Sequence, residues 1–326
     1  MTATEKTTKR RIVVVAIGAA WLVGISALVT LVDGFLGNVP IARAVLGGLL
    51  VSIAVGRAGV LWDDDDPDGD SYKKPALLAL GGAGRSASIA LLTIALSIAF
   101  GWASIGPGHP ALALLVGVLV ALGGAVRDEL LLRALPLHFA RRAGLVGAGV
   151  GTGPVSIATP TELSVVAFSA LLSVAPLVLA PRSTGTALVL AAAIAFLHAA
   201  YQLRTRSVWA PVASSFILRL ALGPTLQTGL LRIEWKVGEL TLGSLAEGHA
   251  VWIFAVLAVG VAAFGLPRRP LPPPDPLSVE PAARRRPGPR RSPRTPRRPP
   301  QATPTSEPRP EPAESQREPP EPERLP

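Results

Sequence analysis

The sequence predicts an all-α polytopic membrane protein with about eight transmembrane helices and a disordered C-terminal tail. Of its 326 residues, 49% are hydrophobic and only 17% are charged, and the mean hydropathy of +0.43 is high for a soluble protein. Apolar runs of about twenty residues, the length that crosses a bilayer, recur along the first two thirds of the chain. The runs are unbroken, whereas barrel strands would alternate over about ten residues, so we expect helices.

The first apolar run, at about 12–32, follows a polar segment that ends in Lys9-Arg10-Arg11. A cleaved signal peptide would have a shorter apolar region and a small-residue cleavage site, which Asp33–Gly37 does not supply well. We therefore expect an uncleaved anchor. The later spans are expected at about 40–62, 85–103, 110–126, 162–180, 184–203, 208–223 and 249–266.

Composition divides the chain into five expected parts. The acidic loop Asp63–Asp70 lacks the Gly and Glu placement of an EF-hand, so a solvated turn is favoured over a Ca²⁺ site. The C-terminal tail is too poor in apolar residues to offset its ordering entropy. The parts are a cytoplasmic N-terminus at 1–11, two leading transmembrane helices with the acidic loop at 12–74, a core at 75–225, a loop and last transmembrane helix at 226–266, and the Pro/Arg/Glu-rich tail at 267–326.

The distribution of basic residues predicts the topology. With the N-terminus inside, the first two connections on the outer side, 33–39 and 104–109, carry no Lys or Arg. The connections on the inner side carry Lys73, Lys74, Arg127, Arg133, Arg141, Arg142, Arg204 and Arg206. Both termini are therefore expected in the cytoplasm. The Arg-, Ala- and Pro-rich composition is typical of a bacterium of high genomic GC, so we expect the membrane to be a bacterial inner membrane. An additional pass within 144–160 would break the parity and stays open.

Composition also excludes several kinds of site. The chain has no cysteine, which excludes disulfides, thiolate catalysis and Cys-ligated metals. The net charge is +10, but the tail from Pro267 onward holds 13 Arg and 8 acidic residues, so +5 of this charge lies there. The basic balance is therefore no sign of a nucleic-acid-binding domain, and the expected partners include the lipid bilayer but no nucleic acid.

The chemistry is expected around the stretch Arg127–Arg133, which puts two carboxylates and two arginines at the end of an apolar run. Glu129 and Arg133 are four residues apart, so they share a helix face in the favourable order. Asp128 points about a quarter-turn away, so a buried Glu129–Arg133 pair would leave it free to act as something other than a salt-bridge partner. The alternative is that all three side chains lie among the lipid headgroups.

His198 lies well inside an apolar span, where a histidine is costly and usually faces the bundle interior. At about 1.5 Å per residue it lies roughly 6–9 Å below the cytoplasmic end of that span. Ser214 and Ser215 lie at about the same depth in the next span. We therefore expect three separated elements to meet in one polar site near the cytoplasmic end of the bundle. A helix-packing hydrogen bond is the alternative for His198.

These motifs resemble the CPBP family, the CAAX-prenyl-protease and bacteriocin-processing (Abi-like) intramembrane endopeptidases. The family motif Glu-Glu-x-x-x-Arg corresponds to Asp128–Arg133, and Phe-x-x-x-His corresponds to Ile194–His198. Trp209-Ala210-Pro211 leads into the region of the third motif, His-x-x-x-Asn or Asp. The resemblance covers roughly 75–225 and implies a CPBP-like helical core.

The chain departs from the family pattern at four positions. The first glutamate of the family is Asp128 here, one methylene shorter, and small displacements of a catalytic group can cost large rate factors. The Phe of the second motif is Ile194. In the third motif, Ser215 stands in place of the His and Arg219 in place of the Asn or Asp, which makes that motif degenerate.

The resemblance implies hydrolysis of a peptide bond by an activated water. Asp128 would be the general base, oriented by the Glu129–Arg133 pair, while His198 would bind the water or stabilise the oxyanion and Ser215 would complete the site. Such acid/His activation requires no cofactor. A divalent metal is the alternative, with Asp128, His198 and His138 as its ligands, although two of these alone would be too few for zinc.

The function that follows is that of an intramembrane endopeptidase cutting membrane-anchored peptides or proteins. Two alternatives stay open. One is a catalytically impaired family member that keeps the fold and acts as a membrane binding partner. The other is an unrelated transporter or scaffold whose polar residues line a pathway, although the sequence has no convincing internal repeat of the kind transporters show.

Overall fold

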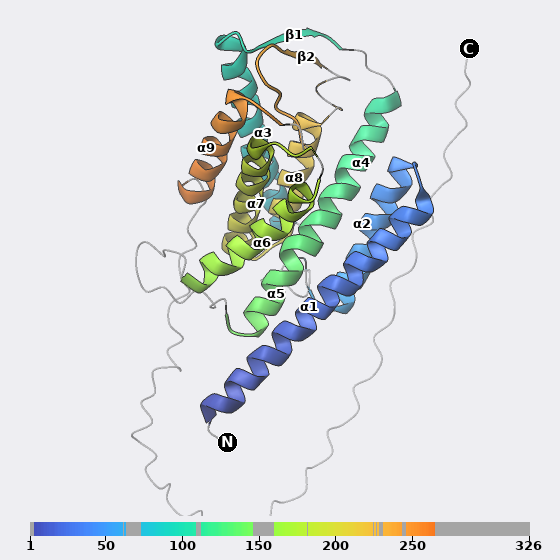
Figure 1. Cartoon of the computed structure of the whole chain (residues 1–326), viewed down its shortest axis with the longest axis vertical. Coiled ribbons are helices and arrows are strands. Elements are labelled where there is room, and N and C mark those ends of the chain that lie inside the picture. Colours follow the sequence, from blue (N-terminus) through green and yellow to red (C-terminus); the bar gives the residue numbers. More distant parts are fainter. Residues whose placement is uncertain are drawn as a thin grey trace, which may run out of the picture. The chain divides into compact units, whose positions relative to one another are not determined.

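The computed structural model describes residues 3–60, 62, 73–108, 112–145, 160–180, 182–223, 225, 227, 231–242 and 246–264. Within these ranges the chain is mainly helical, with one small sheet (Figure 1). Three segments singled out in the sequence, the acidic loop 63–70, residues 146–159 and the tail 267–326, lie outside the described residues.

Each of the eight predicted apolar spans overlaps a helix, although α3 begins twelve residues before the predicted start at 85 and α2 ends five residues before the predicted end at 62. Four of these helices, α1, α2, α3 and α7, are long and apolar enough to cross a membrane by length and composition. The spans are represented by α1 (Ala3–Leu36), α2 (Pro40–Arg57), α3 (Lys73–Ala99), α4 (Leu112–Glu129), α6 (Pro160–Val178), α7 (Gly185–Thr205), α8 (Trp209–Leu222) and α9 (His249–Phe264).

The helical path continues beyond α4 through the charged cluster, whereas the sequence predicted that the apolar span ends just before it. It passes through a one-turn π-helix, η1 (Leu130–Ala134), into α5 (Leu135–Arg142), with helical backbone angles at both junctions. The three segments run end to end in Figure 1. The acidic cluster therefore lies within one helical stretch, with both carboxylates in ion pairs and with Leu130 and Leu131 buried.

The π-helix has a local cause in Pro136, which has no N–H to give to the carbonyl four residues earlier. That carbonyl belongs to Leu132, and it accepts a hydrogen bond from Ser169 Oγ of α6 at 3.0 Å instead. Single turns of π-helix inside α-helices are often found at functional sites. Here the turn carries Arg133 toward α6.

The expectation of an all-α chain needs one correction. Strand β1 (Ala103–Pro107) pairs antiparallel with β2 (Leu231–Trp235), where connecting loops were predicted. The strand β2 alternates polar Arg232 and Glu234 with apolar residues, the period of a half-buried strand. Its apolar residue Ile233 packs with Ile94 and Ala103, so the sheet covers one end of α3.

Small residues let the helices that carry the site approach closely, as in other membrane bundles. A Cβ added to Gly123 of α4 would come within 2.3 Å of the Ala44 carbonyl oxygen of α2. A Cβ added to Gly82 of α3 would come within 2.2 Å of the Ala210 carbonyl oxygen of α8. The backbone positions of α4 and α8, which bear the charged residues, are thus fixed by close contacts.

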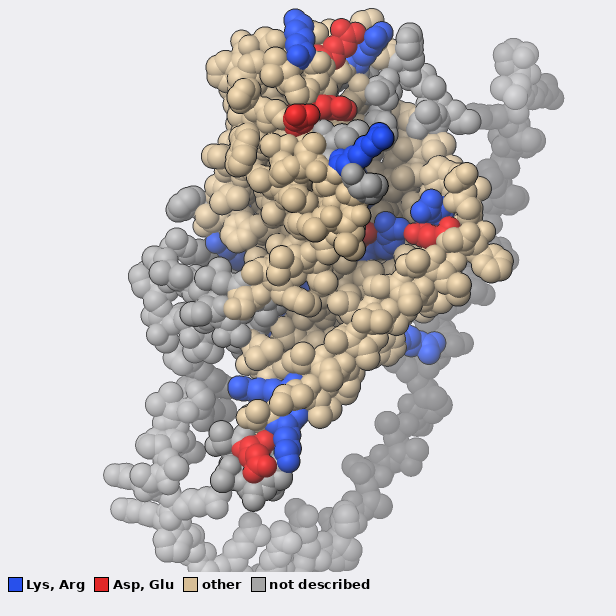
Figure 2. All heavy atoms as spheres, in the orientation of Figure 1, with Lys and Arg blue, Asp and Glu red and all other residues tan. Residues whose placement is uncertain are grey.

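Charged side chains on the face shown in Figure 2 gather mainly near the two ends of the described bundle. Most of the surface between them is uncharged, as expected of helices that meet lipid. Acidic and basic groups also meet beside α1, where Asp33 contacts Arg127 at 3.4 Å and Arg43 at 3.8 Å. These pairs connect the end of α1 to α2 and α4.

Candidate active site

A cavity of about 630 Å³ lies inside the bundle and is lined by residues of α1, α4, η1, α6, α7 and α8. We refer to it as the central cavity. All five residues that the sequence predicted for catalysis line this cavity. They are Asp128, Glu129, Arg133, His198 and Ser215.

Glu129 and His198 form the buried part of the site. Their side chains are each only 1% exposed, and His198 Nδ1 lies 2.8 Å from Glu129 Oε1. That separation is the length of a hydrogen bond, although the ring N–H does not point straight at the oxygen. Arg133 Nη1 contacts the same carboxylate oxygen at 2.5 Å. Because Arg133 already balances the charge of Glu129, the His198 ring beside this carboxylate can be neutral.

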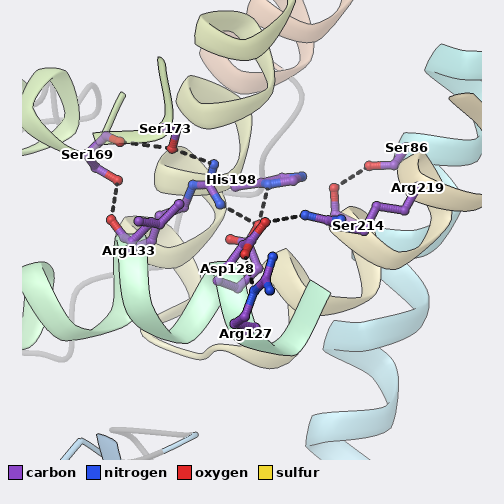
Figure 3. A network of polar contacts seen from close by, with 11 residues as sticks. Ser86, Arg127, Asp128, Arg133, Ser169, Ser173, His198, Ser214 and Arg219 are labelled. Carbon is purple, nitrogen blue, oxygen red and sulfur yellow. Dashed lines mark hydrogen bonds and ion pairs between the residues drawn. The ribbon is translucent and has the colours of Figure 1, made fainter. Parts of the chain in front are cut away.

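Helix α6 holds Arg133 in place. Ser173 Oγ accepts a hydrogen bond from Arg133 Nη2 at 3.0 Å and donates one to the Ser169 carbonyl, also at 3.0 Å (Figure 3). Ser169 in turn bonds the Leu132 carbonyl that Pro136 leaves without its helical partner. The guanidinium is therefore fixed from two sides, and it fixes the carboxylate of Glu129.

Asp128 has different partners from those expected. Its carboxylate contacts Arg127 Nε at 3.0 Å and forms a second ion pair with Arg219 of α8. The prediction that Asp128 would stay outside salt bridges is therefore wrong. The Arg219 side chain passes close to Gly124 of α4 where it reaches Asp128. A Cβ added to Gly124 would come within 2.8 Å of Arg219 Nη1.

The histidine of the site contacts Glu129, whereas the sequence predicted that Asp128 would be the carboxylate that works with it. Successive residues on a helix point about 100° apart, so only one of two adjacent carboxylates can face α7.

The partner of Asp128 could have been found from the sequence. An arginine inside an apolar span, such as Arg219, is costly without a carboxylate nearby, and Asp128 is such a group.

The two adjacent serines of α8 have separate roles. Ser215 lines the central cavity, where its hydroxyl can donate a hydrogen bond. Ser214 is fully buried and shares a 2.5 Å hydrogen bond with Ser86 of α3 (Figure 3). Only Ser215 therefore belongs to the site.

His138 does not join the metal set Asp128, His198 and His138 that the sequence suggested. It is absent from the lining of the central cavity and its ring packs edge-on against Phe139, with centroids 5.3 Å apart. Ten residues beyond Asp128 on one continuous helix amount to about 15 Å along the axis. In the part of the chain that the structure describes, no three His, Asp or Glu side chains are placed to hold a metal ion.

No protein-family model, curated protein or solved structure matches this chain. What the site can do must therefore follow from its geometry. His198 Nε2 is buried and has no hydrogen-bond partner among the described residues, and the residue lines the cavity. An imidazole whose other nitrogen faces a carboxylate can accept a proton from a water molecule. Ser215 and Arg219 supply hydrogen-bond donors to the same cavity.

Proposed function

We propose that the chain is an intramembrane endopeptidase of the CAAX-protease-like type, in which His198 is the general base that activates water. The observation that carries the proposal is the buried Glu129–His198 contact at 2.8 Å beside a cavity. Asp128 is less suited to be the base, because two guanidinium groups already bind its carboxylate. The proposal therefore assigns the base to the imidazole and keeps the residue set that the sequence indicated.

The reaction follows from the placement of these groups. Water attacks the carbonyl carbon of the substrate while one of its protons moves to His198 Nε2. Glu129 orients the ring and stabilises the imidazolium that forms, as a carboxylate does in other histidine-dependent hydrolases. The imidazolium then gives its proton to the leaving amine nitrogen as the carbon–nitrogen bond breaks.

The negative charge that develops on the carbonyl oxygen requires donors that are already in place. Ser215 O–H and the guanidinium of Arg219 line the same cavity and would supply them. Donors fixed before the reaction stabilise the transition state without reorganisation, and removing one typically costs about 10²–10³-fold in kcat. Arg219 would thus supply a donor from the position where the family pattern has the Asn or Asp of the third motif.

The substrate is proposed to be a membrane-associated peptide or protein. Two of the helices that line the cavity, α1 and α7, are long and apolar enough to cross a bilayer. The cavity is also wide enough for a peptide segment, because ligand pockets commonly span about 300–1,000 Å³.

The test compares purified full-length protein in liposomes on a library of membrane-anchored peptides. We expect His198→Ala to lower kcat by about 10²–10⁴-fold, the usual contribution of a general base. His249→Ala is the matched control, because that ring stacks on Trp102 at 5.0 Å and does not line the cavity. Cleavage by His198→Ala at the rate of the unmodified protein would refute the proposal.

One observation favours a second candidate, a catalytically impaired family member that binds membrane partners. Asp128 is held by Arg127 and Arg219 and stands where the family has a glutamate. In the same assay this candidate predicts no cleavage of any peptide by the unmodified protein. It also predicts peptide binding that Arg219→Gln weakens, whereas the endopeptidase proposal predicts turnover.

A further inference from the structure

The central cavity takes its walls from one part of each helix that borders it. On α7 its lining runs from Ala187 to His198, and the last seven residues of the helix take no part. On α8 the lining begins at Ser215, after six residues of the helix, and ends at Arg219. On α1 it begins at Ser26, in the last third of the helix. The cavity therefore extends from the polar site toward the end of the bundle where α7 begins and where α1 and α8 end.

That end of the bundle carries the β1–β2 sheet, and we call it the sheet end (Figure 1). Leu242, which follows β2, also lines the cavity, and its N–H donates to the Leu222 carbonyl at the end of α8 at 3.1 Å. The Thr184 hydroxyl, just before α7, donates to the Ala246 carbonyl at 2.6 Å. The start of α1 and helix α5 lie at the opposite end, which we call the α5 end. The segment after β2 is thus bonded to the helix ends that border the cavity.

Toward the α5 end, packed side chains close the cavity. Leu130, Leu135 and Val212 belong to one buried cluster, which joins η1 and α5 to the start of α8. Arg141 Nη2 of α5 donates a hydrogen bond to the Gln202 carbonyl of α7 at 3.2 Å. None of these residues lines the cavity. Among the described residues, the packing on this side therefore separates the cavity from the α5 end.

The exposure of the lining residues increases in the other direction. Glu129 and His198 are buried at the closed end of the cavity. Thr30 of α1 and Pro176 of α6, which also line it, are exposed, and Leu242 is 36% exposed. The cavity thus has its mouth toward the sheet end.

The depth of the site differs from the sequence prediction, which placed it near the cytoplasmic end of the bundle. In the continuous helical stretch from α4 to α5, Asp128 lies sixteen residues after Leu112 and fourteen before Arg142, about 24 Å and 21 Å along the axis. The polar site is therefore near the middle of that stretch. His198 is closer to the end of α7, but it borders a cavity that extends the other way.

Basic residues indicate which end faces the cytoplasm, because Lys and Arg are enriched in the cytoplasmic segments of membrane proteins. Those at the α5 end are Lys9–Arg11, Arg57, Lys74, Arg141, Arg142, Arg204 and Arg206. Those at the sheet end are Arg43, Arg182, Arg232 and Lys236. Two of the latter are paired with acids, Arg43 with Asp33 at 3.8 Å and Arg232 with Glu234 at 3.0 Å. The distribution favours a cytoplasmic α5 end and an outer sheet end.

We propose that the central cavity opens to the outer side of the membrane, so that water and ligand reach His198 through the sheet end. The direction of the opening does not depend on hydrolysis. The identity of the substrate does rest on the proposed endopeptidase function, and it would be a peptide segment of a membrane-anchored protein on the outer side of the bilayer. A cytoplasmic segment would meet the packed side chains of the α5 end instead.

The test uses the absence of cysteine from the chain, since a single introduced cysteine is then its sole thiol. Full-length Ala191→Cys is expressed in bacterial cells and treated with a permanently charged thiol reagent. Ala191 lines the cavity seven residues from His198 toward the sheet end. We expect labelling in spheroplasts, which present the outer side, to be at least about tenfold faster than in inverted vesicles, because a permanent charge hinders passage through the bilayer core.

Three further cysteine variants mark the two ends and the closed side. Val237→Cys, at a position 45% exposed just after β2, marks the sheet end, and Arg142→Cys, at the exposed last residue of α5, marks the α5 end. Ala199→Cys is the control for folding, because Ala199 adjoins His198 but is fully buried outside the cavity lining. It should stay unlabelled from both sides, whereas an unfolded chain would react.

A second probe on another helix guards against a local effect at Ala191. Thr30→Cys of α1 also lines the cavity and should react from the same side as Ala191→Cys. Labelling of Ala191→Cys from the side that labels Arg142→Cys, or from neither side, would overturn the proposal. Labelling of Val237→Cys from the cytoplasmic side would overturn it as well.

The side of the substrate is tested with two single-pass helices expressed beside the protein, which carry the same library peptide on the outer or the cytoplasmic side. We expect cleavage of the outer peptide, lost in His198→Ala, and none of the cytoplasmic one. Cleavage confined to the cytoplasmic peptide would contradict the inference. If neither is cleaved while Ala191→Cys is labelled from outside, the endopeptidase function fails and the outer opening stands.

Discussion

The two adjacent carboxylates of α4 border one cavity, and their different partners define a Glu129 side and an Asp128 side of it. Glu129, with its partners Arg133 and His198, is almost fully enclosed, and none of the three side chains is more than 5% exposed. On the other side, the side chains of Asp128, Arg127 and Arg219 are 25%, 27% and 30% exposed. Neighbouring positions on one helix turn thus produce a dry contact with a histidine and a partly hydrated ion-pair cluster.

This difference in burial changes what each charge contributes. Removing one partner of a buried ion pair leaves an uncompensated charge and typically costs about 3–5 kcal/mol. Pairs that are partly exposed contribute less than buried ones, because their charges are better screened. The comparison suggests that the Glu129 side is a rigid unit suited to chemistry. The Asp128 side can rearrange at little cost when a ligand enters.

The largest expected effect comes from neutralising each carboxylate in turn. Glu129→Gln should lower the free energy of unfolding by about 3–5 kcal/mol, because Arg133 loses its buried counter-ion. Asp128→Asn should lower it by less, because Arg127 and Arg219 stay partly exposed when they lose this counter-ion. Reversible unfolding in mixed micelles measures both values. Equal losses for the two variants would remove the distinction between the two sides.

A smaller effect is expected at the adjacent glycines that place α4 against its neighbours. Gly123→Ala should destabilise by about 1–3 kcal/mol, because its Cβ would meet the backbone oxygen of Ala44 at 2.3 Å and must shift a helix. Gly124→Ala should cost less, since its Cβ would meet the end of the Arg219 side chain.

The same unfolding measurement tests this pair, and the two alanine variants serve as controls for each other. A larger loss for Gly124→Ala than for Gly123→Ala would show that the Arg219–Asp128 contact is rigid. The Asp128 side of the cavity would then resemble the Glu129 side.

The sequence was sufficient to predict the eight helical segments, because long apolar runs have few alternatives in a membrane. It also predicted which side chains share the cavity, since costly charges in apolar helices have few places to go. The partner of His198 was not predictable, because whether position 128 or 129 faces α7 depends on how α4 rotates in the bundle.

Two parts of the fold were also missed for physical reasons. The continuity from α4 to α5 was hidden because charges usually mark the end of a span, and here Asp128, Glu129 and Arg133 are compensated internally. The β1–β2 sheet was missed because each strand has only five residues, and a period-2 pattern of that length is weak evidence for a strand.

The protonation of the His198 ring tests the central claim most directly and needs no substrate. With ¹⁵N-labelled histidine in the full-length protein, nitrogen NMR distinguishes the two ring nitrogens, and His198→Gln assigns its signals among the four histidines. At pH 8, above the usual histidine pKa of about 6.5, we predict a proton on Nδ1 facing Glu129 and a bare Nε2. A ring protonated on Nε2 and bare on Nδ1 would contradict the assignment of His198 as the base held by Glu129.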